Sequence, residues 1–443
     1  MKKTLIFIIV LILIVSLAGC NRAFSLKNND TNNKNNTASN SSEMYEMNNS
    51  FNTKTSDKTV QSTPNKLENS NQNKLSSHSL TVNSSTKNKK LNTYINNNNS
   101  DSSINTPTSF YSNLSMKNTS IGWIVKDNKI LRTEDGWKSY KDITPYKYKT
   151  NSSYDEMIPS GVYFYDSNTA WVSLGSYKQE KKLTIYHTID GGEHWNKTYL
   201  PVNEYWEYAG KQYISFINNK TGFILVTSDA ACGMMSKSIY KTIDGGVSWK
   251  KLGDITNKIA SYPTGITFNN SMDGWITSTY HGQNYILAFK TKDGGVNWKK
   301  DNLQLFPYHN KIRYTDVYPP IFFKDNKENG ILPIKYVEDN ARYIMPYITS
   351  DGGNTWNIPK NFKNNKFLIY DFTNEKKWWA IDQEKDKLYL TQNSGENWKE
   401  ISENKIFKNI NYIQFVNKKV GFAIGYHIFI KTVDGGKSWI KIN

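Results

Sequence analysis

The residue types most able to do chemistry recur in one short motif of this 443-residue chain. The motif TIDGGVSW (242–249) has close copies at 188–195, 291–298, 349–356 and 432–439, and weaker copies at 133–140 and 391–398. A carboxylate beside two glycines suggests a cation-binding loop. However, each copy brings one carboxylate to its own repeat, and no cluster with the spacing of metal ligands results. We therefore predict no metal and no cofactor. A structural role is predicted instead for the seven motif positions Asp135, Asp190, Asp244, Asp293, Asp351, Asn393 and Asp434.

The motif is typical of a turn between two β-strands. Its aspartate can accept hydrogen bonds from backbone N–H groups in the turn, and its glycines supply positive φ without a Cβ clash. The threonine two residues before the aspartate has the β-branched shape that suits a strand end. The tryptophan three residues after the second glycine opens the next strand and can fold back over the hairpin. These tryptophans are Trp195, Trp249, Trp298, Trp356, Trp398 and Trp439.

Less ordinary residues gather in three segments outside the motifs. NEYWEY (203–208) sets three aromatic residues among two glutamates, DAACGMMSK (229–237) places Cys232 beside two methionines, and TYHGQN (279–284) contains a histidine. Aromatic residues and arginine are enriched at binding hot spots. The alternative is that the aromatic residues cover the edge of a sheet and that the histidine and Cys232 are ordinary residues. The candidate binding residues are Tyr205, Trp206, Tyr208, His281, Arg313 and Arg342.

The segments around each motif indicate four short strands per repeat. In the last repeat these are IQFVN (413–417), VGFAIG (420–425), HIFIKT (427–432) and SWIKI (438–442), separated by turn signals. Successive motifs are 41 to 58 residues apart. Four strands in a unit of this length are typical of a propeller blade. We therefore predict an all-β fold, a seven-bladed β-propeller of four-stranded antiparallel blades over residues 107–443.

The strand order predicts two faces with different loops. Connections from fourth to first strand and from second to third strand emerge on one side, the loop face, and the motif turns lie on the opposite side, the box face. Long loops gather on the loop face over blades two to five, and long loops often carry function. They are predicted at 143–160, 173–182, 199–212, 226–237, 301–320 and 335–342.

The motif T-x-D-G-G-x-x-W resembles the Asp-box, or BNR, repeat of bacterial sialidases, sortilin-type receptors and some glycoside hydrolases. With its preceding GW-like strand, the whole repeat is most similar to that of the photosystem II assembly and stability factor family. That family and its non-photosynthetic bacterial relatives form seven-bladed propellers. The resemblance covers 107–443 and implies a non-catalytic scaffold or assembly factor that binds another protein. The binding patch of the family is arginine-rich, whereas this chain has only four arginines, which leaves the mode of contact open.

Two enzymatic alternatives follow from the same resemblance. Sialidases with this repeat hold a substrate carboxylate with three arginines, but Arg132 precedes a box threonine and belongs to the box side, so sialidase activity is not expected. Another glycoside hydrolase would need two carboxylates about 5–10 Å apart. Its loop-face candidates are Asp155, Glu156, Glu204, Glu207, Asp316 and Glu338, and no spacing singles out a pair. A carbohydrate-binding protein or such a hydrolase therefore stays as the alternative function.

The N-terminus predicts export and lipid anchoring. The segment MKKTLIFIIVLILIVSLAGC has two lysines, an apolar run and a small-residue cleavage site, as in a secretory signal. Its ending resembles the lipobox of bacterial lipoproteins, which predicts a signal peptide at 1–19 and lipidation of Cys20; an uncleaved anchor is the alternative. Residues 20–106 are rich in Asn, Ser, Thr and Lys, and are predicted to form a disordered tether that spans roughly 50 Å.

Charge and location narrow the expected partners. The formal net charge is +17, almost all of the positive charge is lysine, and no segment resembles a nucleic-acid-binding motif. We expect a lipid-anchored protein of the bacterial cell membrane that faces outside the cytoplasm. Its expected partners are the membrane, through the lipid on Cys20, and a surface protein or wall polysaccharide of unknown identity; nucleic acid is not expected.

Overall fold

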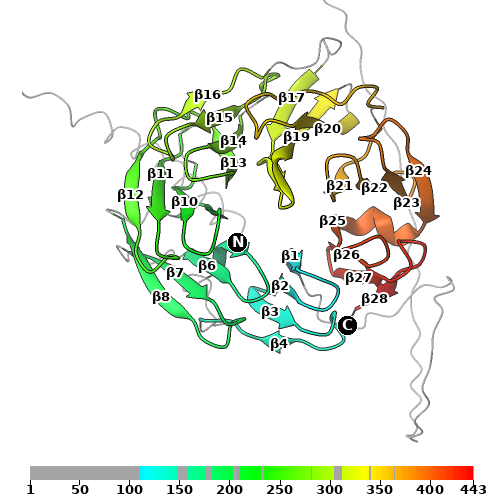
Figure 1. Ribbon diagram of the computed structural model, residues 1–443, viewed down its shortest axis with the longest axis horizontal. Coiled ribbons are helices and arrows are strands. Elements are labelled where there is room, and N and C mark those ends of the chain that lie inside the picture. Colours follow the sequence, from blue (N-terminus) through cyan, green and yellow to red (C-terminus); the bar gives the residue numbers. More distant parts are fainter. Residues whose placement is uncertain are drawn as a thin grey trace, which may run out of the picture. The chain divides into compact units, whose positions relative to one another are not determined.

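The chain folds into seven four-stranded antiparallel sheets, arranged as blades in a ring (Figure 1). This confirms the predicted seven-bladed propeller. The predicted signal and tether, 1–19 and 20–106, lie outside the described residues. Within the described ranges no helix is long and apolar enough to cross a membrane. The computed structural model describes residues 110–146, 158–175, 182–202, 207, 209–230, 234–280, 282–303, 312–338, 341–363 and 365–442.

Six blades are built from four consecutive strands, each paired with the next from the ring centre outward (Figure 1). The first three are β1 (Tyr111–Met116), β2 (Gly122–Lys126), β3 (Lys129–Thr133) and β4 (Lys141–Asp142); β5 (Ile158–Phe164), β6 (Ala170–Gly175), β7 (Lys182–Thr188) and β8 (Asn196–Pro201); and β9 (Gln212–Phe216), β10 (Gly222–Thr227), β11 (Lys237–Thr242) and β12 (Lys250–Asp254).

Blades 4, 6 and 7 repeat this order. They consist of β13 (Tyr262–Phe268), β14 (Gly274–Thr279), β15 (Ala288–Thr291) and β16 (Lys299–Lys300); of β21 (Ile369–Phe372), β22 (Trp378–Asp382), β23 (Lys387–Thr391) and β24 (Lys399–Glu403); and of β25 (Ile410–Phe415), β26 (Gly421–Gly425), β27 (Ile428–Thr432) and β28 (Ile440–Lys441). A short 3-10 helix, η2 (Lys405–Asn409), connects blades 6 and 7.

Blade 5 reaches four strands in a different way. Its strands are β17 (Ile312–Val317), β18 (Ile321–Phe323), β19 (Asn326–Glu338) and β20 (Ala341–Thr349), and β17 and β18 pair with successive parts of the same long β19. Pro319 and Pro320 separate β17 from β18, because proline has no N–H to donate to the ladder. At the outermost position of this blade, the described residues form a single bridge, between Ile348 and Asn357.

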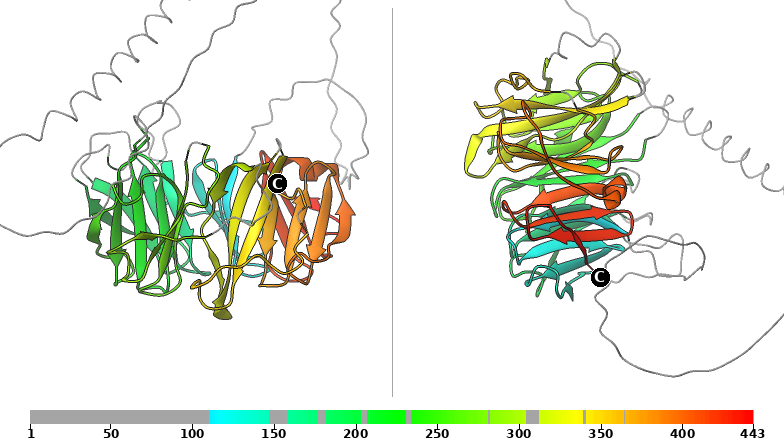
Figure 2. Two further views of the ribbon diagram at one scale, coloured as in Figure 1. Left: turned by 90° about the horizontal axis from the view of Figure 1, so that it is seen from above. Right: turned by 90° about the vertical axis from the view of Figure 1, so that its right-hand side faces the viewer.

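The β18–β19 hairpin of blade 5 extends beyond the neighbouring strands on the box face (Figure 2). At its tip, the Lys324 Nζ lies 6.0 Å from the centroid of the Tyr165 ring, which follows the inner strand of blade 2. Blades 2 and 5 are not neighbours in the ring. The hairpin therefore reaches across the ring at the box-face end of the central channel.

Aromatic stacks between neighbouring blades form the core. The Trp171 ring in β6 of blade 2 stacks 3.5 Å from the Phe216 ring in β9 of blade 3, and Phe223 stacks 3.4 Å from Phe268 one blade further on. Gly222 makes room for this arrangement, since a Cβ there would lie 2.4 Å from the ring of Phe216. The glycine thus leaves room for the aromatic ring of the inner strand, and the aromatic residue after it packs against the next blade.

Contacts between blades 7 and 1 close the ring, and the two blades share no strand. The Gln414 side chain accepts from the Met116 N–H at 2.8 Å and donates to the Met116 carbonyl at 3.0 Å. The Lys431 Nζ donates to the Gly136 carbonyl at 2.9 Å. These bonds join residues from the two ends of the propeller, so closure depends on both terminal blades.

Candidate functional site

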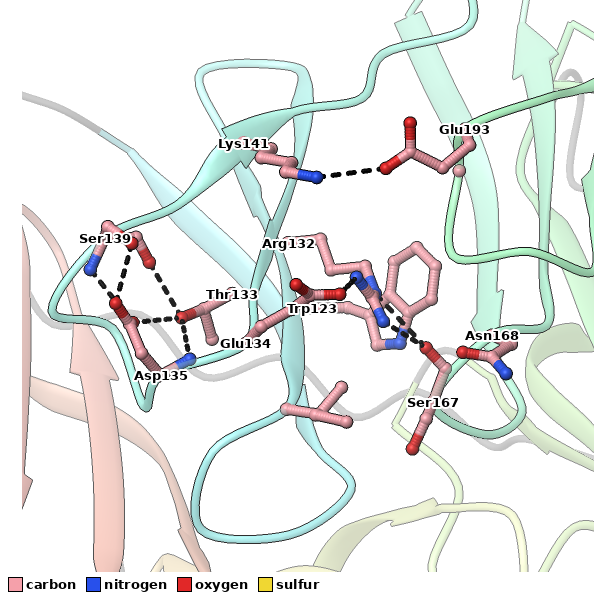
Figure 3. Close-up of polar contacts among 12 residues, drawn as sticks. Trp123, Arg132, Thr133, Glu134, Asp135, Ser139, Lys141, Ser167, Asn168 and Glu193 are labelled. Atoms are coloured by element: carbon pink, nitrogen blue, oxygen red, sulfur yellow. Dashed lines mark hydrogen bonds and ion pairs between the residues drawn. The ribbon is translucent and has the colours of Figure 1, made fainter.

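The motif turns use their polar groups within the fold, as the first copy shows (Figure 3). The Thr133 hydroxyl donates to Asp135 at 2.9 Å and accepts from the Trp137 N–H at 2.9 Å. The hydroxyl and then the N–H of Ser139 also bind the Asp135 carboxylate, and they lower its pKa to about 2. In blade 6 the Asn393 side-chain oxygen accepts equivalent bonds from Thr391 and from the Asn397 N–H. An amide oxygen can therefore replace the carboxylate, and the threonine contributes its hydroxyl as well as its shape.

The motif tryptophans lie against the interblade stacks. The Trp249, Trp298 and Trp439 indoles each donate to the carbonyl of the second glycine of their own motif, at 3.2, 2.9 and 3.1 Å. Trp249 and Trp298 meet the inner-strand phenylalanine of the same blade edge-on, at a centroid distance of 6.0 Å. The remaining members are partly or largely buried, and they are Trp195, Trp356 and Trp398.

The residue before the motif threonine binds the next blade. The Arg132 guanidinium lies over the Trp123 ring at 5.3 Å and donates to the Ser167 carbonyl of blade 2 at 3.0 and 3.2 Å (Figure 3). Lys290 repeats this arrangement over Trp275 and donates to the Gly353 carbonyl at 2.5 Å. Arg132 is thus buried on the box side and unavailable to a ligand on the loop face.

Of the predicted binding residues, the structure describes two. Tyr205, Trp206, Tyr208 and His281 lie outside the described residues, as do Cys20 and Cys232. Arg313 and Arg342 are exposed, and the pairing of β17, β19 and β20 places both at the loop-face end of blade 5.

Three of the six candidate carboxylates on the loop face are described, and they are Glu207, Asp316 and Glu338. Asp316 accepts a hydrogen bond from the Thr279 hydroxyl at 2.6 Å and lies 3.7 Å from the Lys335 Nζ. Asp316 thereby links blade 5 to blade 4. The candidates Asp155, Glu156 and Glu204 lie outside the described residues. In the described ranges no group of three or more His, Cys, Asp or Glu could hold a metal ion.

A cavity of about 280 Å³ lies between blades 3 and 4, and its lining comes from loop-face connections. Blade 3 contributes the segment before β11, and blade 4 contributes the residue after β14. The chain that joins the two blades forms a further wall, held by Ile255 and Ile259, which are buried in the apolar cluster below. The lining residues are Met234, Met235, Lys237, Thr256, Asn257, Ala260, Ser261, Tyr262 and Tyr280.

Tyr262 and Tyr280 form an aromatic wall of this cavity, with their rings stacked at 5.7 Å and 18°. Tyr280 is 38% exposed and Met234 is 62% exposed, so both are accessible at the loop face. Methionine adapts to irregular partners, and tyrosine offers large contact area with a polar end. The accessible part of the cavity therefore suits an apolar or aromatic group.

Lys237 is the charged residue of the described lining, and only 2% of it is exposed. Its Nζ donates to the Met235 carbonyl at 2.6 Å. Its backbone is fixed as well, since its N–H donates to the Thr256 hydroxyl and its carbonyl accepts from Ile255. Burial lowers the pKa of Lys237 to about 8, against the opposing attraction of Asp254. The amine is consequently protonated at neutral pH, inside the wall of a cavity.

Sequence reasoning identified the segments 229–237 and 279–284 but not the residues that define the cavity. Lys237, Ser261 and Tyr262 carried no motif. One signal was available: side chains alternate along β11, so Lys237 lies on the same side of the strand as the apolar residue Ile239. A lysine at such a position is unusual unless it is paired or functional.

Neither a protein-family model nor a curated protein matches the chain. Similar solved structures include YCF48 bound to D1 peptide, with 17% identity and a TM-score of 0.49 over 76% of this chain and 96% of that chain. YCF48 from Cyanidioschyzon merolae has 15% identity and a TM-score of 0.43, over 74% and 97%. The GH74 xyloglucanase from Xanthomonas campestris has 9% identity and a TM-score of 0.49, over 74% and 54%. The neighbours thus include the photosystem II assembly factor to whose family the repeats are similar. Identities this low leave function to be argued from the site.

Proposed function

We propose that this chain is a cell-surface lipoprotein whose propeller binds another protein on its loop face, as a scaffold or assembly factor without catalysis. The observation that carries the proposal is the cavity between blades 3 and 4. Its described lining offers two methionines and two stacked tyrosines at the surface, and contains no carboxylate or imidazole. Such a lining supplies contact area and lacks the paired acid and base that hydrolysis of a glycosidic bond requires.

The remaining loop face supports the same function. Arg313 and Arg342 are exposed at the end of blade 5, two blades from Met234 and one from Tyr280. A partner that contacts both the cavity and these arginines would cover the loop face of blades 3 to 5. The propeller below is held by interblade stacks and hydrogen bonds, so it offers a rigid surface that needs little reordering upon binding.

Site-specific photocrosslinking tests this function. A photoreactive amino acid would replace Met234 on the loop face or, as a matched control, Ile189 on the box face; these residues are 62% and 63% exposed. Intact cells that express the full chain would be irradiated, and the adducts identified by mass spectrometry. We expect one protein to be crosslinked from position 234 and to be absent from position 189.

The outcomes separate the alternatives. Equal crosslinking from both positions would mean that contact is unspecific, and would refute a loop-face site. An adduct that contains wall polysaccharide and no protein would support the carbohydrate-binding alternative. Combined substitution of Arg313 and Arg342 by alanine should weaken the protein adduct if the partner also covers blade 5.

A further inference from the structure

Strand β11 places a lysine at each end of the interface between blades 3 and 4. Lys237, Ile239 and Lys241 point to the same side because side chains alternate along a strand. Ile239 belongs to the apolar cluster between the two blades. At the box-face end, the Lys241 Nζ lies over the Phe223 ring at 5.1 Å. At the loop-face end, Lys237 lines the cavity. The two lysines share one strand and differ in what they face.

The charge of Lys237 is poorly compensated within the protein. An ammonium group has three N–H donors, and among the described residues the Nζ makes one hydrogen bond, to the Met235 carbonyl. Among the described residues no carboxylate lies within ion-pair distance of it. Asp254 is exposed and accepts from the Thr256 N–H. A buried cation without a paired anion is costly. An anion that enters the cavity would therefore be attracted to the ammonium group and could accept hydrogen bonds from its remaining N–H donors.

A second polar group points to the same ligand chemistry. The Ser261 hydroxyl is buried, with 4% of the residue exposed, and has no hydrogen-bond partner among the described residues. Buried hydroxyls are normally hydrogen-bonded. Ser261 lines the same cavity as Lys237. The cavity thus contains an ammonium group and an unused hydroxyl donor, next to the apolar surface of Met234 and Tyr280.

We propose that this cavity is a binding site for a carboxylate on an apolar or aromatic body, with the carboxylate at Lys237 and Ser261 and the body against Met234 and Tyr280. The inference rests on the proposed function and specifies what the loop face recognises. A carboxylate accepts from both donors at once, and charge-assisted hydrogen bonds are about twice as strong as neutral ones. The cavity volume of about 280 Å³ suits a group of roughly phenylbutyrate size.

Calorimetric titration of the full chain with two matched probes tests the site. 4-Phenylbutyrate and 4-phenylbutyramide have nearly the same shape and differ in charge. We expect the acid to bind at least about tenfold more tightly than the amide, since hydrogen bonds to a charged group are stronger than those between neutral groups. Equal affinities for the two probes, or no binding of the acid at millimolar concentration, would overturn the proposal.

Two variants separate the role of the charge from a structural role. Lys237→Met removes the ammonium group and should abolish the preference for the acid, whereas Lys241→Met, on the same side of β11 but at the box face, should retain it. Ser261→Ala is the milder change and should reduce the preference for the acid severalfold. It tests the site even if Lys237→Met does not fold. A Lys237→Met protein that folds and still prefers the acid would overturn the proposal.

Competition shows whether the carboxylate belongs to the partner protein or to a free acid. If 4-phenylbutyrate reduces crosslinking from position 234 in wild type but not in Lys237→Met, an acidic group of the partner occupies the cavity. If the acid binds and crosslinking is unchanged, the cavity takes a small organic acid beside the partner. If wild type binds the acid and the amide equally while crosslinking from position 234 is intact, the carboxylate site is overturned and the proposed function still stands.

Discussion

Lys237→Met should make the propeller more stable at neutral pH, although it alters a residue that is 2% exposed. Burial lowers the pKa of Lys237 from its ordinary value of 10.5 to about 8. At about 1.4 kcal/mol per pH unit, this difference means that the charged side chain costs about 3 kcal/mol of stability. The variant loses the hydrogen bond to the Met235 carbonyl, which costs about 1 kcal/mol. The net gain is about 2 kcal/mol, or a rise in melting temperature of about 3 °C for a domain of this size.

The gain should depend on pH in a defined direction. Below about pH 8 the amine is protonated in the folded and in the unfolded chain, and the full cost is present. Between about pH 8 and 10.5 the unfolded chain binds more protons than the folded chain, so the stability of wild type rises with pH. Above this window the amine is neutral in both states. The difference in stability between Lys237→Met and wild type should therefore be largest below pH 8, and should become small as the pH approaches 10.5.

Melting curves of wild type and Lys237→Met at pH 7 and pH 10, followed by circular dichroism, measure both effects. Lys241→Met is the control, since it removes a cation over the Phe223 ring and should lower stability by about 0.5–1 kcal/mol. A Lys237→Met protein that melts below wild type at pH 7 would refute the reasoning. A difference of equal size at both pH values would show that buried charge is not its cause.

Three other predictions concern the fold and the anchor. Gly222→Ala should destabilise the propeller by about 1–3 kcal/mol, because its Cβ would lie 2.4 Å from the Phe216 ring, whereas Gly253→Ala meets nothing within 4 Å; equal melting temperatures for the two variants would contradict the packing argument. The folded-state pKa of Asp135 is lowered to about 2 by Ser139, so its contribution to stability is present above about pH 4 and lost as the pH falls toward 2. The asparagine of Asp135→Asn does not titrate, so the variant should lose less stability than wild type between pH 4 and pH 2, as followed by circular dichroism. Acid titration curves of the same shape for both proteins would argue against this. Cys20→Ser should abolish palmitate labelling and membrane retention; labelling that persists would indicate another anchor.

The repeat was readable from the sequence because each blade is specified locally. The motif threonine, aspartate and glycines bind one another within a few residues, as Thr242, Asp244 and Gly246 do. A glycine–aromatic pair such as Gly222–Phe223 opens the second strand in blades 1, 3, 4 and 7, and it recurs for the same packing reason. Because these contacts join residues a few positions apart, they recur in each repeat. The pattern of one repeat therefore predicts a blade, and the number of repeats predicts the number of blades.

Blade 5 shows where this local pattern stops being sufficient. The repeat pattern predicts four short strands in every blade, whereas β19 covers Asn326–Glu338 and carries a hairpin across to blade 2. Pro319 and Pro320 interrupt the inner strand, but only the ring arrangement determines that the extension meets Tyr165. The sequence left open what lies at the centre of the ring, since contacts between distant blades leave no periodic signal.

The sequence by itself determined the class of fold, the number of blades and the turn chemistry, since these depend on residues that lie close together along the chain and repeat. Tertiary structure decided the site. Lys237, Ser261 and Tyr280 come from three separate parts of the chain, and they share a cavity because blades 3 and 4 pack side by side. Burial, and the absence of an ion-paired carboxylate among the described residues, are properties of that packing, so a lysine that looks ordinary in the sequence becomes the charged wall of a cavity.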